Sequence, residues 1–244
     1  MSSLHREVML VLLGDITGGA VAEGERLPTL TDLASQFGVS TGVVRECQRA
    51  LAERGLVSVH HGRRALVRPQ QDWDVFDPDV LAALVSGDRA TQVLGEYLES
   101  RRLLEVEAAG LAAERATPEA IQELADAFDA MRRAAERARG NAAAEPLYQQ
   151  ADIDFHRAIV RAAGNRTLAR MAEPIHSALS ATFGALARPQ TRFERGLPEH
   201  ARVLDAIASG DAAGARLAMR QHLLTVEGYL HERTAAGAPA AAPG

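Results

Sequence analysis

Residues 30–68 have the sequence LTDLASQFGVSTGVVRECQRALAERGLVSVHHGRRALVR, in which helical and strand patterns alternate with glycines. A short helical segment ends at Gly38, and Ser40 or Thr41 can cap a second helix that stops at Gly55. Two short β-like runs with a basic turn between them close the stretch. We expect helices at 4–17, 32–37 and 41–54 and strands at 56–59 and 65–67. This order of elements predicts a winged helix-turn-helix.

Positive charge is concentrated at this end of the chain. Residues 40–68 carry six arginines against two acidic residues, although the formal net charge of the whole chain is −5. This distribution is typical of a DNA-binding module attached to a larger domain, while on charge alone a solvated arginine-rich surface explains it equally well. In such a fold the second helix enters the major groove and the wing tip meets the backbone or the minor groove. The residues expected to contact DNA are Ser40, Thr41, Arg45, Arg49, His61, Gly62 and Arg63.

The rest of the chain is predicted to be helical. Residues 69–78 are polar, contain two prolines and the only tryptophan, and are expected to form a linker. From residue 79 to 234, helical periodicity punctuated by glycine and proline predicts an all-α bundle of six or seven helices. Residues 235–244 contain only alanine, glycine and proline and are expected to be disordered. The predicted fold class is mainly α, with the winged helix-turn-helix domain at 1–68.

Composition excludes several classes of protein. The single cysteine, Cys47, excludes an internal disulfide and a cysteine-based metal cluster. All 27 basic residues are arginine, which excludes lysine Schiff-base chemistry and the lysine of a phosphate-binding loop. No stretch approaches the roughly 18–20 apolar residues that span a bilayer, and the N-terminus has no secretory pattern. We therefore expect no membrane partner and a cytoplasmic location.

Four polar residues of the helical region lie on otherwise apolar helical stripes: Asp152, His156, His200 and His222. Asp152 precedes His156 by four residues, so the two side chains project from one helical face. A buried carboxylate is costly unless it is paired or bound to a cation. Three imidazoles and one carboxylate suit a divalent metal such as Zn²⁺, Ni²⁺ or Mn²⁺. The alternative is that each histidine is a hydrogen-bonded core residue, which for any single histidine is the commoner case.

Arg101 is a fifth polar residue on an apolar stripe. A buried guanidinium requires an anionic partner, preferably a bidentate one. The carboxylate of a small-molecule effector could be that partner. Glu105, four residues further on the same helix, is the internal alternative. His176 could lie near the cavity that binds this effector.

Four short motifs at the N-terminal end have a specific spacing: GERLP at 24–28, LASQFGVS at 33–40, VRE at 44–46 and LAERGLV at 51–57. With these motifs, residues 4–68 resemble the DNA-binding domain of GntR-type regulators. The resemblance implies binding to double-stranded operator DNA and supports Arg45, His61 and Gly62 as contacts. The sequence departs from the family pattern at Leu30, Thr31 and Thr41.

The helical region carries a second set of motifs: ESRRLLE at 99–105, DIDFHRAI at 152–159, AGN at 163–165, EH at 199–200 and HL at 222–223. With them it resembles the FCD ligand-binding domain of FadR-type GntR regulators. In metal-containing members an Asp and three His at these positions bind a divalent cation; carried over, they are Asp152, His156, His200 and His222. The resemblance also implies a homodimer, usually a repressor, that a small carboxylic or sugar acid releases from DNA.

The expected function is therefore that of a DNA-binding transcriptional regulator, not an enzyme. A metal-dependent hydrolase domain fused to a DNA-binding module is the alternative, because a bound metal could activate water. No separate residue in the sequence has a clear general-base role, which weighs against that alternative. A dimerisation module without any ligand is a third interpretation.

Overall fold

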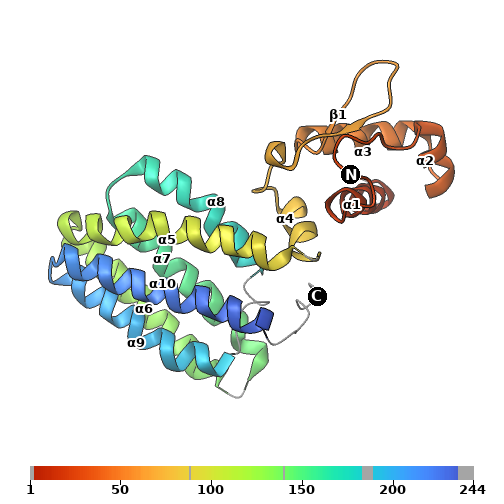
Figure 1. The fold of residues 1–244 in the computed structure, drawn as a ribbon. Helices are drawn as coiled ribbons and strands as arrows, with labels where there is room; N and C mark the ends of the chain where they lie inside the picture. The colour runs from red at the N-terminus through yellow and green to blue at the C-terminus, as the bar shows by residue number, and fades with distance from the viewer. Residues whose placement is uncertain (1–2, 88, 140, 183–188, 236–244) are drawn as a thin grey trace. The chain divides into compact units, whose positions relative to one another are not determined.

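The computed structural model describes residues 3–87, 89–139, 141–182 and 189–235. The chain forms two compact units, Met1–Ala90 and Thr91–Gly244 (Figure 1). Its secondary structure is mainly α with one two-stranded sheet, which confirms the expected fold class. The tail expected to be disordered, 235–244, lies outside the described residues apart from Ala235, which ends the last helix.

Three helices build the core of the first unit: α1 (Ser3–Thr17), α2 (Leu30–Phe37) and α3 (Thr41–Glu53). Thr29 and Asp32 form a reciprocal capping box that begins α2. Gly38 ends α2 with a φ of 65°, a left-handed conformation that glycine adopts without strain. Ser40 then begins α3, since its side chain accepts from the amide of Val43. These local signals produce the tight turn between the two helices.

The wing follows α3 as an antiparallel pair, β1 (Val57–Ser58) and β2 (Leu66–Val67). Val57 lies opposite Val67, and Arg26 forms an isolated bridge to Leu66 from the other side. Both strands are shorter than the sequence predicted: Val59 leaves the ladder and is exposed, whereas Ala65 is buried and its carbonyl accepts from the amide of Leu27.

Only a glycine fits at position 55, between α3 and the wing. Its φ is 76°, and a Cβ there would lie 2.1 Å from the carbonyl oxygen of Asp72. Asp72 belongs to the 3₁₀ turn η1 (Gln70–Asp72), which precedes α4 (Pro78–Val85). We expected the linker at 69–78 and the helical domain from 79; in the structure α4 packs against α1 and the compact units divide after Ala90.

The second unit is a helical bundle (Figure 1). Its elements are α5 (Ala90–Arg115), α6 (Pro118–Ala138), η2 (Ala142–Ala144), α7 (Glu145–Ala162), α8 (Arg166–Thr182), α9 (Pro189–Ala208) and α10 (Ala212–Ala235). Helix α6 packs along α7, α7 along α8, and α9 along α10. Across the described ranges, no helix combines the length and apolar character that a membrane span requires.

Alanine and aliphatic side chains from all six α-helices listed for this unit form one apolar core, with Phe155, Tyr148 and Phe193 as its large aromatic members. Helix α9 differs from the expectation that proline punctuates the helices of this region. Pro189 is instead the first residue of α9, a position where its missing N–H costs no hydrogen bond, and the helix continues through Pro198.

Candidate DNA-reading face and metal centre

The second helix of the helix-turn-helix, α3, presents a polar face. Val44 and Leu51 are buried, as the helical period requires, whereas Thr41, Arg45 and Arg49 are exposed. Ser40, also exposed, caps the helix through its side chain, so its hydroxyl has a structural task at the predicted contact position.

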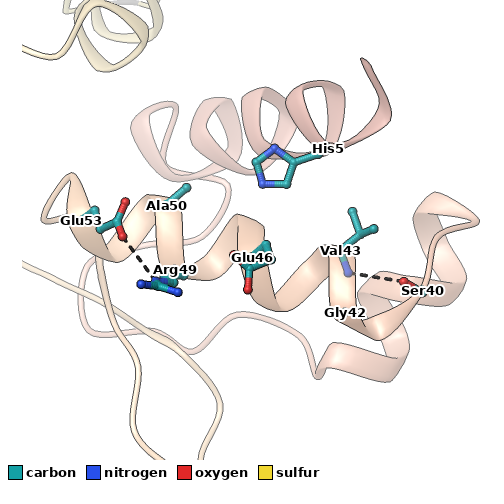
Figure 2. Close-up of a pocket in the computed structure, with 8 residues that line it drawn as sticks. All are labelled: His5, Ser40, Gly42, Val43, Glu46, Arg49, Ala50 and Glu53. Atoms are coloured by element: carbon teal, nitrogen blue, oxygen red, sulfur yellow. Dashed lines mark hydrogen bonds and ion pairs between the residues drawn. The ribbon is translucent and has the colours of Figure 1, made fainter. Parts of the chain in front are cut away.

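The two arginines of this face differ in their partners. Arg49 pairs with Glu53 one turn further along α3, with 3.4 Å between Nε and Oε1 (Figure 2). Arg45 forms no ion pair with any residue that the structure describes. An open groove of about 570 Å³ runs along α3 beside His5 of α1, and Glu46 and Arg49 are among the residues that line it (Figure 2). Of these two arginines, only Arg49 forms an ion pair within the described residues, so binding DNA breaks no ion pair of Arg45.

The wing tip carries the remaining predicted contacts, His61, Gly62 and Arg63, and all three are exposed. Gly62 has a φ of 69°, and the amide of Arg63 donates to the carbonyl of His60 across the turn. The tip is thus a tight basic turn suited to close approach by a phosphate backbone.

Three histidines from three helices converge in the interior of the second unit: His156 on α7, His200 on α9 and His222 on α10. One ligand nitrogen of each ring lies within 4.8 Å of those of the other two. The Nε2 atoms of His156 and His200 are 3.1 Å apart, and Asp152 Oδ1 lies 3.1 Å from His200 Nε2. The structure therefore brings together the three histidines that the sequence assigned to a metal, and Asp152 joins them through its contact with His200.

The Nδ1 atom of each imidazole is bound to an acceptor of its own. The three pairs are His156 with Glu105 Oε2 at 2.5 Å, His200 with the Gly196 carbonyl at 2.7 Å, and His222 with Glu199 Oε2 at 3.0 Å. Because a carbonyl or carboxylate oxygen accepts and does not donate, the hydrogen-bond network assigns a proton to each Nδ1. Each Nε2 is then the ring nitrogen left available to a ligand, as in metal-binding histidines whose other nitrogen donates a hydrogen bond.

Glu105 on α5 accepts three buried hydrogen bonds. Its Oε1 accepts from Arg101 Nε and from His176 Nε2, each at 2.7 Å, and its Oε2 from His156. Burial raises the pKa of Glu105, but the charge of Arg101 and the hydrogen bonds from His156 and His176 outweigh it and hold the pKa well below its usual value. Arg101 thus has the internal partner that the sequence left open as the alternative to an effector.

Two of the clustered imidazoles are strongly shifted toward neutrality. Burial and the nearby charge of Arg101 lower the pKa of His156 to about 3. Burial, with a smaller electrostatic contribution from the neighbouring His200, lowers the pKa of His222 well below its ordinary value. Both rings are neutral at pH 7, which is the state in which imidazole binds a metal.

The sequence did not predict the carboxylates that hold two of these histidines. Glu199 had no predicted role, although it directly precedes His200, and it also accepts from Thr225 Oγ1 at 2.9 Å. The sequence offers Glu105 only as a partner for Arg101, whereas its two histidine contacts come from α7 and α8. Its burial was predictable, because Glu105 lies on the same apolar stripe of α5 as Arg101.

The two units together define a class: transcriptional regulators that join a winged helix-turn-helix to an all-helical domain. Residues 4–67 match the family described as "Bacterial regulatory proteins, gntR family", and residues 96–225 match the FCD domain. The chain therefore belongs to the GntR family of bacterial regulators, in the group that carries an FCD domain.

Individual relatives agree with this assignment. The chain is 31% identical to the HTH-type transcriptional regulator LutR of Bacillus subtilis, over 89% of this chain and 98% of LutR. It is 28% identical to the galactonate operon transcriptional repressor of Escherichia coli, over 84% of this chain and 88% of that protein.

Solved structures show the same fold. One is Lar, described as controlling the Listeria monocytogenes agr system, with a TM-score of 0.64 and 18% identity over 95% of this chain and 98% of that one. Another is E. coli McbR/YncC, with a TM-score of 0.52 and 23% identity over 96% of this chain and all of that one.

Proposed function

We propose that this regulator is a repressor that binds a pseudo-palindromic operator as a homodimer and is released by a small carboxylic or sugar acid. The E. coli relative is named for a galactonate operon, and galactonate is a sugar acid. One short recognition helix per chain buries too little surface for high specificity, which favours two chains on one operator. The effector site is the buried cluster of the helical unit, with a divalent cation held by Asp152, His156, His200 and His222.

One observation gives the main support for a bound metal: the buried Nε2 of His222 has no hydrogen-bond partner among the described residues. With both Nδ1 atoms donating elsewhere, the Nε2 lone pairs of His156 and His200 face each other and repel unless a positive group lies between them. A proton on His200 would satisfy Asp152 and His156 but leave His222 unpartnered. A divalent cation would satisfy all four, so the donor set fits a cation better than a proton.

The bound cation would supply positive charge for an anionic ligand and offset the cost of burying Asp152. Ions such as Zn²⁺, Ni²⁺ or Mn²⁺ suit one carboxylate and three imidazoles. Arg101 is the proposed second contact for the effector carboxylate, with its guanidinium oriented by Glu105 through Nε. A regulatory, non-enzymatic role accords with the family, in which the relatives named above are regulators.

The test begins with an operator selected from random duplex DNA by the purified chain. Metal-loaded protein is screened by thermal shift against hydroxy acids and sugar acids, and each stabilising acid is assayed for operator release. We expect at least one acid to do both. Stabilising acids that leave operator binding unchanged, or acids that the protein consumes, would contradict the proposal.

Arg101→Lys keeps the charge but loses the planar fork, so it should impair release by the acid while operator binding stays intact. Arg102→Lys is the matched control, because Arg102 pairs with Glu227 outside the buried cluster. Wild-type release by Arg101→Lys would assign Arg101 a structural role through Glu105.

A further inference from the structure

A second cavity of the helical unit lies between α7 and α8, with a volume of about 440 Å³. Its lining consists of Arg157, Val160, Arg161, Arg166, Ala169, Arg170, Glu173 and His176. None of the four candidate metal ligands is among these residues. The cavity is therefore a separate feature from the metal centre, with a size in the range of small-molecule sites.

Four of the eight lining residues are arginines, in a chain whose net charge is −5. They form two pairs at helical i,i+4 spacing, one on each helix, so all four can face the same space. Arg157 is neutralised by Glu173, with contacts of 3.1 and 2.5 Å. Arg161, Arg166 and Arg170 are exposed and have no side-chain partner within the described part of the chain.

The helix ends explain only part of this charge, since Arg161 lies in the last turn of α7, where the macrodipole favours positive charge. Arg166 is the first residue of α8 and Arg170 follows one turn later, at the helix end where the macrodipole disfavours positive charge. The first amides of α8 are already capped, since Asn165 Oδ1 accepts from Thr167 and Leu168. Three guanidiniums without a side-chain partner around one cavity repel each other, and an anion between them would relieve that repulsion.

His176 connects the cavity to the metal centre. It lines the cavity, is only 4% exposed, and its Nε2 is bound to Glu105 Oε1 at 2.7 Å. The other carboxylate oxygen of Glu105 holds His156. A ligand touching His176 would thus be two hydrogen bonds away from a candidate metal ligand.

We propose that the α7–α8 cavity is a second ligand site that binds a small anion with two or more negative charges, either a phosphate or a polycarboxylate. The planar guanidinium fork matches both groups, and three forks on two helices favour multiple charge over a monocarboxylate. The site is distinct from the proposed effector site and does not depend on a bound metal.

The test is calorimetric titration of the full chain, stripped of metal by EDTA and dialysed, with inorganic phosphate in one arm and propane-1,2,3-tricarboxylate in the other. We expect saturable binding of one anion per chain in at least one arm, which also identifies the source chemistry. Arg161→Gln combined with Arg170→Gln should weaken it at least about tenfold through the loss of two charge-assisted contacts. The control pair Arg132→Gln and Arg220→Gln removes the same charge elsewhere on the unit and should leave affinity within about twofold.

Absence of saturable binding in both arms would overturn the proposal. Equal losses in the two double variants would also overturn it, because only net charge would then matter. His200→Ala should bind the anion as wild type does; loss of binding there would place the anion at the histidine cluster instead. If the cavity variant weakened sequence-independent DNA binding as much as anion binding, the arginines would form a DNA-backbone surface and the small-anion site would be disproved.

Discussion

The two units use the same residue types, arginine and histidine, in opposite environments: exposed in the first unit and buried in the second. In the first unit the arginines and histidines proposed to bind DNA are exposed, and Arg45 has no ion-pair partner in the described chain. In the second unit Arg101 is 3% exposed, and its carboxylate partner Glu105 also holds two histidines. An exposed contact can change without cost to the fold, whereas a buried polar network must be satisfied as a whole. The comparison therefore predicts where mutations damage stability and where they damage binding only.

The largest effect is expected from Glu105→Ala. The substitution leaves a buried guanidinium and two buried imidazoles without their shared acceptor, and removing one partner of a buried pair typically costs about 3–5 kcal/mol. Chemical unfolding of the metal-free protein measures this loss in the free energy of unfolding. The matched control is Glu107→Ala on the same helix, an exposed partner of Arg216 whose loss should change stability little. Equal stabilities for the two variants would contradict the claim that the buried network, unlike an exposed ion pair, must be satisfied as a whole.

Arg45→Ala is expected to weaken operator binding by about 10- to 100-fold, the range for loss of one bidentate base contact, without altering the unfolding curve. Arg49→Ala should have a smaller effect, because Arg49 must first leave Glu53. Fluorescence anisotropy with the selected operator measures both affinities. Wild-type affinity in Arg45→Ala would show that α3 is not the recognition helix.

The smallest effect is expected at the wing. Arg63→Ala should weaken binding uniformly across sequences and lower the slope of log affinity against log salt by about one, as for a single phosphate contact. Titrations at several salt concentrations, on operator and on unrelated duplex, measure this slope. Arg132→Ala, in the helical unit, is the control. An operator-specific loss in Arg63→Ala would instead make this residue a base reader.

The same contrast explains what the sequence could predict. Helical period alone identified Arg101, Asp152 and the three cluster histidines, because a polar residue on an apolar stripe must be buried. It could not identify their partners across helices: Glu105 contacts His156 over 51 residues of sequence and His176 over 71, and nothing local specifies such contacts.

In the first unit the capping and glycine signals predicted each helix to within two residues. The division between units was less predictable, since α4 has a helical pattern like those that follow and only its packing on α1 assigns it to the first unit. Pro189 shows the same limit, because proline begins a helix as readily as it follows one.

The central claim is that the buried cluster is a metal site, and elemental analysis of protein purified without a histidine tag tests it most directly. We expect about one equivalent of a divalent metal per chain, lost in His200→Ala and retained in the exposed control His61→Ala, because a ligand set loses its ion when one ligand is removed. Wild-type protein with less than about a tenth of an equivalent, and no thermal stabilisation by added zinc, nickel or manganese, would contradict the claim and leave three hydrogen-bonded core histidines.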